Sequence, residues 1–163
     1  LLSALEPARP LPIRKERLAD GSPLHFYSAY DQRRTREDML AHKNFPAFKS
    51  LFAELADEVK QREIATLVVV APTKDRVYPT AADGSVTPGG LGESTTGFMA
   101  EVNDLCDAHE LPCFDLLPPL SAAATRLWNE SRELLWWRDD THWNEHGHAI
   151  AAAAIVERLR RER

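Results

Sequence analysis

The segment that most constrains the fold is residues 65–71, with the sequence Ala-Thr-Leu-Val-Val-Val-Ala. A continuous run of aliphatic and β-branched residues, without alternating polar positions, is typical of a strand that is covered on both faces. A polar segment that contains Pro72 and Pro79 follows and ends the run. The sequence therefore predicts a central strand of a parallel sheet, with a polar turn at its carboxyl end.

Helical and strand-like patterns alternate along the rest of the chain. After Pro46, apolar residues recur at helical spacing, which predicts an amphipathic helix with one stripe on the core. Such alternation is typical of a three-layer α/β/α domain with a mostly parallel sheet. Only three or four strands can be counted, so either the sheet is small or its first strands are missing. The apolar stripe comprises Phe48, Leu51, Phe52, Leu55 and Val59. The other expected elements are strands at 24–27, 111–116 and 134–137, and helices within 31–43, from Ser94 or Thr95 to about His109, near 121–127 and after Asn144.

Length and composition fit one globular domain. The chain has 163 residues, of which 44% are apolar and 28% charged, enough to bury a core. Residues 1–23 are rich in proline and are expected to be a lead-in without regular structure, so the domain is placed at 24–163. The net charge of −5 gives no indication of a nucleic-acid partner, and no stretch is long and apolar enough for membrane insertion.

Neither the start of the chain nor its cysteines fixes the compartment. The sequence begins with Leu1 instead of Met and carries no signal peptide, and we interpret this start as a cut that removed a signal or an upstream segment. Cys106 and Cys113 are too few for a disulfide framework. A bond between them across the intervening turn remains open, and two buried free thiols are preferred.

The strongest chemical signal lies at residues 136–148, Trp-Trp-Arg-Asp-Asp-Thr-His-Trp-Asn-Glu-His-Gly-His. A strand-like pair of tryptophans runs into a short polar loop, and Asn144 is a suitable N-cap for the helix that follows. A loop histidine beside a carboxylate can act as a general base, because the carboxylate orients the ring and stabilises the imidazolium. The spacing allows either Asp139 or Asp140 to orient His142. The alternative is a structural loop whose aspartates cap the helix.

The block Asp-Asp-Thr-His-Trp-Asn-x-x-Gly-His at 139–148 resembles the last conserved block of SGNH (GDSL-type) hydrolases, most closely the branch related to alginate O-acetyltransferases. The strand and Pro-x-Lys-x-x-Val-Tyr turn at 65–78, and Phe-Asp-Leu-Leu-Pro at 114–118, are similar to other segments of that family. The resemblance implies a flavodoxin-like fold of SGNH type. Carried over by residue, it makes His142 the catalytic base. Asp140 matches the Asp-Thr-His form of the acid and is preferred, whereas Asp139 matches the commoner Asp-x-x-His form.

The same resemblance implies a function. It indicates a serine-dependent acyl-ester hydrolase or O-acetyltransferase that needs no cofactor and acts on a small-molecule or carbohydrate ester. It also implies a periplasmic or secreted protein. The alternative is a catalytically inert SGNH-like module that binds a glycan or a partner protein.

The nucleophilic half of such a site has no match. The family's Gly-Asp-Ser block and the Gly and Asn of its oxyanion hole are missing, and no serine follows His142. The nucleophile is therefore expected upstream of residue 1, or is absent. Ser94, in Gly-Glu-Ser-Thr-Thr-Gly, imitates the nucleophile turn, but turn-forming residues instead of a strand precede it. We interpret Ser94 as the N-cap of a helix.

A metal site is the rival interpretation of the same segment. His142, Glu145 and His146 match the His-x-x-Glu-His pattern of inverted zincins. That site requires both histidines on one helical face, whereas Asn144 and Gly147 indicate that the helix begins after His142. No metal is therefore expected.

Three further residues complete the candidate site. Lys74 and Tyr78 follow the carboxyl end of the predicted central strand, where both could line the substrate cleft. The preferred alternative is that Lys74 is a surface charge and Tyr78 a packing residue. Trp143, beside the histidine, is the tryptophan best placed for substrate contact. Trp136 and Trp137 point to opposite sides of a strand, so one of them belongs to the core.

Overall fold

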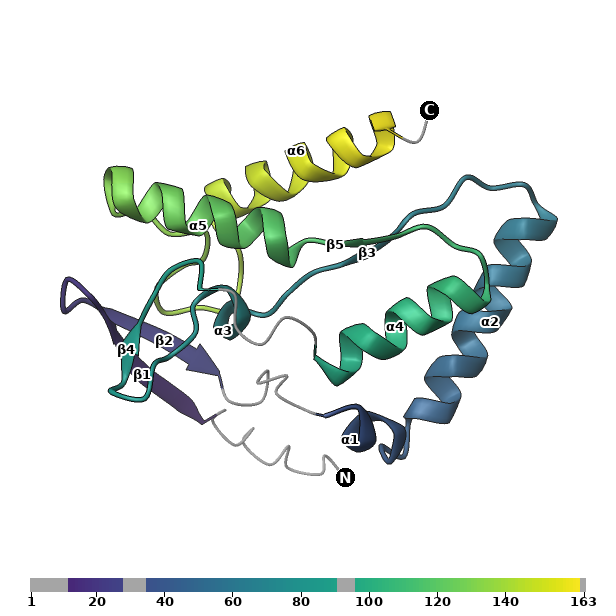
Figure 1. Ribbon diagram of the computed structural model, residues 1–163, viewed down its shortest axis with the longest axis horizontal. Coiled ribbons are helices and arrows are strands. Elements are labelled where there is room, and N and C mark those ends of the chain that lie inside the picture. The colour runs from purple at the N-terminus through teal and green to yellow at the C-terminus, as the bar shows by residue number, and fades with distance from the viewer. Residues whose placement is uncertain (1–11, 28–34, 91–95, 162–163) are drawn as a thin grey trace, which may run out of the picture.

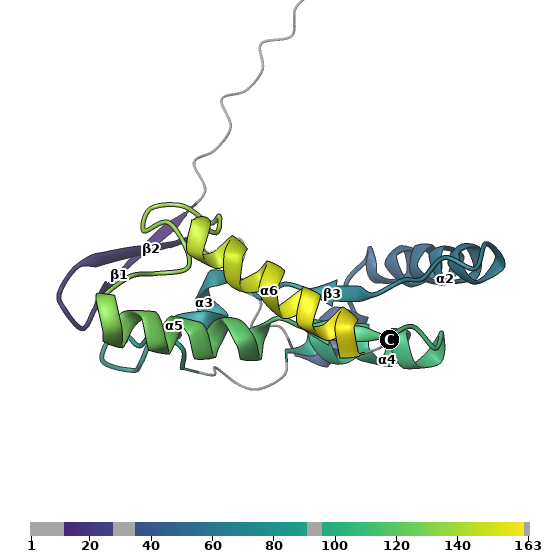
Figure 2. The same cartoon turned by 90° about the horizontal axis from the view of Figure 1, so that it is seen from above.

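The computed structural model describes residues 12–27, 35–90 and 96–161. The sheet of β1, β2 and β4 lies at one end of the molecule, and β3 and β5 run between a group formed by α5 and α6 and a group formed by α2 and α4 (Figures 1 and 2). The strands are β1 (Ile13–Leu18), β2 (Pro23–Tyr27), β3 (Val68–Val70), β4 (Ser85–Val86) and β5 (Cys113–Asp115). The helices are α1 (Arg36–Leu40), α2 (Phe45–Gln61), α3 (Lys74–Val77), α4 (Gly97–Ala108), α5 (Leu117–Ser131) and α6 (Glu145–Arg161).

Parallel pairing occurs in both sheets. β3 pairs with β5 in parallel, with Val69 opposite Phe114. In the other sheet, of order β2-β1-β4, β1 is antiparallel to β2 and parallel to β4. The predicted α/β class with parallel strands is therefore confirmed, although the described strands are divided between two sheets.

The Val-rich run is less covered than its sequence predicts. Val68, Val69 and Val70 form a strand, but all three are half-buried. Among the described residues β3 pairs with β5 alone, so no second neighbour covers its other edge. Because all three valines are only half-buried, the expectation of a strand buried on both faces is wrong.

Regular structure also begins earlier than predicted. β1 lies within residues 1–23, which were expected to lack regular structure, and it aligns Arg14 opposite Phe26 of β2. Pro12 and Pro23 flank β1 without interrupting it, so the prolines remove no hydrogen bond from its interior.

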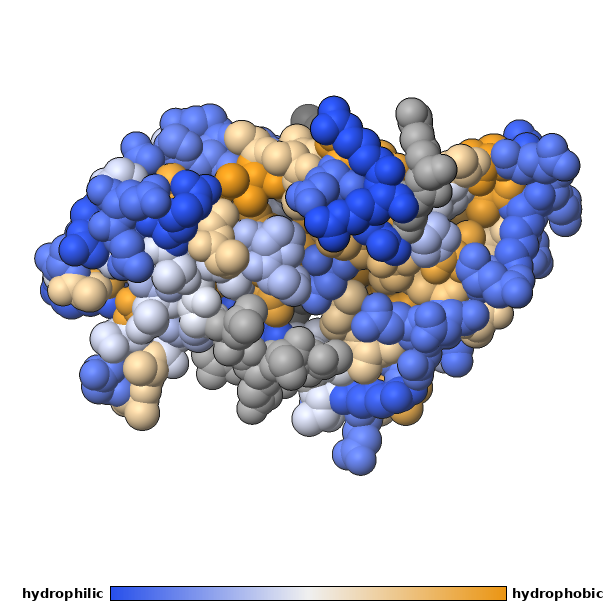
Figure 3. Space-filling model, turned by 45° about the horizontal axis from the view of Figure 1, so that its top comes forward, coloured by the Kyte–Doolittle hydropathy of each residue, from blue (hydrophilic) through white to orange (hydrophobic). Residues whose placement is uncertain are grey.

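The predicted amphipathic helix is confirmed as α2, but its apolar stripe is not fully covered by the core. Pro46 lies in its first turn, and the helix buries Phe45, Ala56 and Val59. Leu51 and Leu55 of the predicted stripe are 64% and 54% exposed. Among the described residues, α2 joins a small core cluster, in which Ala56 and Val59 are buried with Leu111 and Val68 packs against them. Figure 3 accordingly shows hydrophobic residues at the surface on the right, the end at which Figure 1 places α2 and α4.

α4 begins at its own cap and connects to α1. The hydroxyl of Thr96 accepts a hydrogen bond from the backbone N–H of Met99. Ser94, predicted as this cap, lies outside the described residues. The charged segment at 31–43 contributes only the short helix α1, whose Arg36 contacts Glu101 and Asp104 of α4.

The two cysteines meet between α4 and β5 as free thiols. Cys106 is buried and Cys113 half-buried. Burial and the neighbouring Cys113 raise the pKa of the Cys106 thiol to about 12.

The main core lies between the first sheet, α3, α5 and α6. α5 starts earlier than predicted because Pro118 and Pro119 occupy its first turn, where a missing N–H costs no helical hydrogen bond. The strand expected at 134–137 is reduced to one isolated antiparallel bridge between Trp136 and Trp143. No described helix is long and apolar enough to span a membrane. The buried residues of this core are Leu18, Leu24, Phe26, Val77, Tyr78, Val86, Leu116, Leu117, Leu120, Ala123, Ala124, Trp128, Leu134, Leu135, Trp136 and Ala151.

Candidate active site

The polar loop that carries His142 is closed at its base by backbone pairing. The N–H of Trp137 donates to the carbonyl of His142 at 3.2 Å, beside the bridge between Trp136 and Trp143. The N–H of Asn144 donates to the carbonyl of Leu135 at 3.0 Å. The loop from 137 to 142 therefore leaves the core and returns to it at one point, and we call it the histidine loop.

Asn144 joins the end of this loop to α6. Its Oδ1 accepts from the backbone N–H of Gly147 at 3.1 Å, as expected for an N-cap. Its Nδ2 donates to the carbonyl of Leu134 at 2.7 Å, and the residue is buried. The predicted cap is confirmed, and the same side chain also ties the start of α6 to the segment that enters the loop.

Gly147 is required by the close approach of that entering segment. A Cβ atom at this position would lie 2.3 Å from the carbonyl oxygen of Leu135 and 2.9 Å from the Cβ of Trp143. Because both neighbours belong to the base of the loop, a larger residue would displace the loop or the helix.

His142 is paired with Asp140. Their Nδ1 and Oδ1 atoms are 2.7 Å apart, and the backbone N–H of Thr141 donates to the same Oδ1. Both hydrogen bonds lower the pKa of the Asp140 carboxyl, and the bond with His142 has the larger effect. The side chain of His142 is 79% exposed, so its other ring nitrogen faces an open surface.

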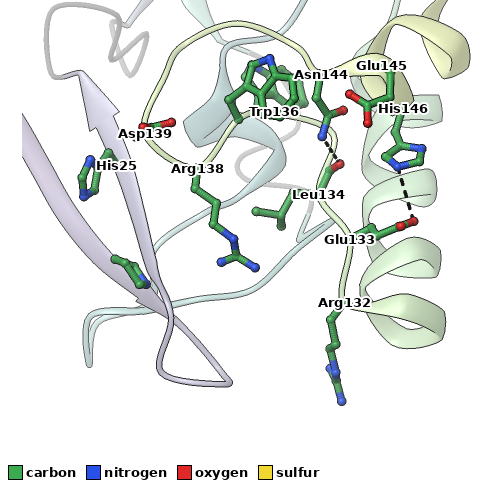
Figure 4. Close-up of a pocket in the computed structure, with 12 residues that line it drawn as sticks. His25, Arg132, Glu133, Leu134, Trp136, Arg138, Asp139, Asn144, Glu145 and His146 are labelled. Atoms are coloured by element: carbon green, nitrogen blue, oxygen red, sulfur yellow. Dashed lines mark hydrogen bonds and ion pairs between the residues drawn. The ribbon is translucent and has the colours of Figure 1, made fainter.

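Asp139 has a different neighbour. Its backbone carbonyl accepts from the hydroxyl of Tyr27 at 3.2 Å, and Figure 4 shows its side chain at the edge of a cavity beside His25. Among the described residues no hydrogen bond joins the Asp139 carboxylate to His142. The geometry therefore pairs the histidine with the Asp-Thr-His aspartate.

Lys74 and Tyr78 lie inside the protein. Lys74 is 6% exposed, and its ammonium is enclosed by backbone carbonyls of β2 and of the histidine loop. Burial lowers the pKa of Lys74 to about 8, and the carboxylates of Asp139 and Asp140 partly oppose that shift. The hydroxyl of Tyr78 accepts from the N–H of Leu135 at 2.8 Å, and burial raises the pKa of this phenol. The position of Lys74 corrects the preferred expectation of a surface charge, whereas Tyr78 packs as expected; neither side chain lines the cavity.

The tryptophans divide between core and surface. Trp136 is buried, and its ring meets the edge of Tyr78 and of Trp143 at centroid distances of 5.8 and 5.9 Å. Trp143 is half-buried and also contacts His148 at 5.6 Å. Trp137 is 51% exposed, which confirms that one of the adjacent pair belongs to the core and the other does not.

A cavity of about 510 Å³ opens beside the histidine loop (Figure 4). Charged groups of both signs line it, and His146 lies 3.5 Å from Glu133 across one wall. Neither His142 nor Asp140 contributes to the lining, so the cavity adjoins the pair without containing it. The lining residues are Pro23, His25, Arg132, Glu133, Leu134, Trp136, Trp137, Arg138, Asp139, Asn144, Glu145 and His146.

A comparison with protein families shows the family to which the chain belongs. The family whose model matches is the SGNH hydrolase-like domain of the acetyltransferase AlgX, over residues 24–163. The chain belongs to this family. No curated protein and no solved structure matches it. The AlgX-type family is one of esterases and acetyltransferases, which agrees with a histidine–carboxylate pair at the surface.

The AlgX-type domain offers no serine to this pair among its described residues. None of their hydrogen bonds joins a serine hydroxyl to His142, and Ser94 lies outside them. The histidine is also unsuited to the rival zinc motif, because α6 begins at Glu145 and His142 therefore does not share a helical face with His146. In the described part of the chain, no three His, Cys, Asp or Glu residues form a group suited to a metal.

Sequence reasoning missed most of the cavity wall. His25 comes from β2, Arg132 from the end of α5, and Arg138 from the histidine loop. Arg138 adjoins the aspartates in sequence, so its position could have been inferred from the motif. The other two belong to no motif: His25 is placed by the hydrogen bond from its N–H to the carbonyl of Arg138, and Arg132 by the end of α5.

Proposed function

We propose that this AlgX-type domain supplies the base and the acid of a serine-dependent acyl transfer. The observation that carries the proposal is the 2.7 Å contact between Nδ1 of His142 and Oδ1 of Asp140, with the opposite face of the ring exposed. In this role Nε2 of His142 removes the proton of the serine hydroxyl and later returns it to the leaving group. Asp140 keeps Nδ1 protonated and stabilises the imidazolium, and no cofactor is needed.

The nucleophilic serine, in this proposal, comes from outside the described residues. The exposure of His142 supports this, because a base whose partner serine lay in the described core would be covered by it. A serine brought in from elsewhere can reach Nε2 without rearranging the histidine loop.

The proposed substrate is an acyl ester of a carbohydrate, in the periplasm or outside the cell. The cavity beside the loop supports a carbohydrate because hydroxyl groups need both donors and acceptors, which Arg138 and Glu133 provide. The exposed ring of Trp137 can stack on a sugar face. Trp143 is less exposed than Trp137, so we assign the proposed contact to Trp137 first.

The test is labelling of the 163-residue chain with a fluorophosphonate, with the labelled residue located by mass spectrometry. A single labelled serine is the result expected when the nucleophile lies within residues 1–163, and His142→Ala and Asp140→Asn should then each abolish labelling. Asp139→Asn is the matched control, because it removes the neighbouring carboxylate and should leave labelling intact. A serine labelled equally in His142→Ala would overturn the proposed role of His142.

An inert binding module is the second candidate, favoured by a cavity that His142 does not line. It predicts no labelling of the folded 163-residue chain, as does a serine upstream of residue 1, so a binding measurement is needed to distinguish the two. It also predicts saturable binding of an acetylated oligosaccharide, measured by calorimetry, that is lost in Trp137→Ala and kept in His142→Ala.

A further inference from the structure

Four backbone carbonyl oxygens converge on the ammonium of Lys74. The ring of Phe26 lies beside this group, with its centroid 5.7 Å from Nζ. Three of the four carbonyls belong to the histidine loop, and the fourth belongs to β2. The donor–acceptor distances from Nζ are 2.9 Å to His25, 2.6 Å to Trp137, 3.2 Å to Arg138 and 3.0 Å to Asp140.

This arrangement depends on the positive charge. An ammonium has three protons to share among the four carbonyls. A neutral amide offers two donors and a hydroxyl one, so no neutral side chain could satisfy the same acceptors as well. Buried carbonyls that point at one another repel and require a donor. Among the described residues no carboxylate forms a hydrogen bond with Nζ; the side chains of Asp139 and Asp140 act on the ammonium through their charge, as does the Arg138 guanidinium with the opposite sign. The ammonium is therefore what allows the carbonyls of the loop to converge.

The same loop holds the histidine pair in a geometry that the pair could not maintain alone. The side chains of His142 and Asp140 are 79% and 48% exposed. A solvent-exposed contact of this kind contributes little and does not fix two side chains by itself. The orientation of the Asp140 carboxylate therefore depends on the backbone of the loop, where the N–H of Thr141 donates to Oδ1 and the carbonyl of Asp140 accepts from Lys74.

We infer that Lys74 is the positioning residue of the His142–Asp140 pair: its ammonium fixes the backbone of the histidine loop at Asp140, and so keeps the Asp140 carboxylate directed at Nδ1 of His142. Lys74 does not contact the ring of His142 and does not line the cavity, so it acts on the pair through the backbone of the histidine loop. The inference rests on the proposed function only in treating the pair as catalytic.

The experiment measures the tautomer of His142 by imidazole nitrogen-15 shifts at pH 7.5 in the 163-residue chain. In the wild-type protein the two ring nitrogens should be well separated, with the proton on Nδ1. Lys74→Met keeps most of the length of the side chain and removes the ammonium. In this variant the difference between the Nδ1 and Nε2 shifts should fall by at least half, because both tautomers are then populated. Lys74→Arg keeps charge and donors and should restore most of the separation.

A matched control separates positioning from stability. Leu120→Ala removes a fully buried side chain from the same core without touching the loop, and it should leave the separation unchanged. Lys74→Gln, which retains two donors, should give an intermediate value and serves if Lys74→Met does not fold. A wild-type separation in folded Lys74→Met or Lys74→Gln would overturn the inference. Unfolding of both variants, while Leu120→Ala folds, would also overturn it in favour of a purely structural role.

The outcome is independent of acyl transfer. The nitrogen shifts report the contact between His142 and Asp140 without serine or substrate. Loss of the contact in Lys74→Met therefore supports the positioning role of Lys74 even if fluorophosphonate labels no serine. Conversely, labelling that depends on His142 supports the proposed function even if the contact survives in Lys74→Met.

Discussion

Two ends of this molecule bury their apolar side chains to different extents. Around the base of the histidine loop, Trp136 packs against Tyr78 and Trp143 in the large core. At the other end, α2 shares a small cluster with Leu111, and Leu55 on its predicted stripe is half exposed. The base of the histidine loop is therefore packed into the large core, whereas α2 buries only part of its apolar face.

The largest expected contrast is between Trp136→Ala and Leu55→Ala. Removing the buried indole should lower the free energy of unfolding by about 3–5 kcal/mol, because it leaves a cavity between Tyr78 and Trp143. Leu55→Ala should change it by less than about 0.5 kcal/mol, because this side chain is mostly exposed. Urea denaturation measures both values. Equal losses would show that α2 is as firmly packed as the loop base.

The helix caps extend the comparison. Asn144→Ala should lower the free energy of unfolding by about 2–3 kcal/mol, since it removes the cap of α6 and leaves the buried carbonyl of Leu134 without its donor. Thr96→Ala removes only the cap of α4 and should cost about 1 kcal/mol. Thermal unfolding followed by circular dichroism distinguishes them. A smaller loss in Asn144→Ala than in Thr96→Ala would contradict the central position of Asn144.

Lysines at the two ends should differ in how they couple stability to pH. The pKa of Lys74 is lowered to about 8 on folding, from an ordinary value of 10.5. Between these values the unfolded chain holds more protons, so the free energy of unfolding should rise with pH, by at most about 1.4 kcal/mol per unit. The four carbonyl acceptors favour the charged form, which makes this slope an upper bound. Lys74→Met should abolish the rise in denaturation curves, and Lys49→Met, on α2, should retain it.

The smallest expected effect is in the exposed pair. The hydrogen bond of His142 is the first cause of the lowered pKa of Asp140, so His142→Ala should move this pKa upward toward its ordinary value of 3.8. Any stability that Asp140 contributes is present above that ordinary value and lost as the pH falls through the lowered one. A carbon-13 titration of the Asp140 carboxyl checks the shift. An unchanged pKa would mean that the pair does not form in solution.

Much of the local structure follows from the sequence. The apolar spacing after Pro46 predicted α2, the Val run predicted β3, and Asn144 marked the start of α6. The Asp-Thr-His-Trp block led to the pair of His142 and Asp140. These features depend on residues near one another in the chain, where backbone geometry and short-range hydrogen bonds decide the outcome.

Only the tertiary structure decided which apolar and charged residues are buried. Leu51 and Leu55 continue a helical stripe that nothing in the described chain covers, because periodicity reports which face is apolar and not what packs on it. Lys74 looked like a surface charge, since a site made of backbone carbonyls has no side-chain signature. Carbonyls that belong to β2 and to the histidine loop, 49 to 66 residues away, meet its ammonium only once the chain has folded.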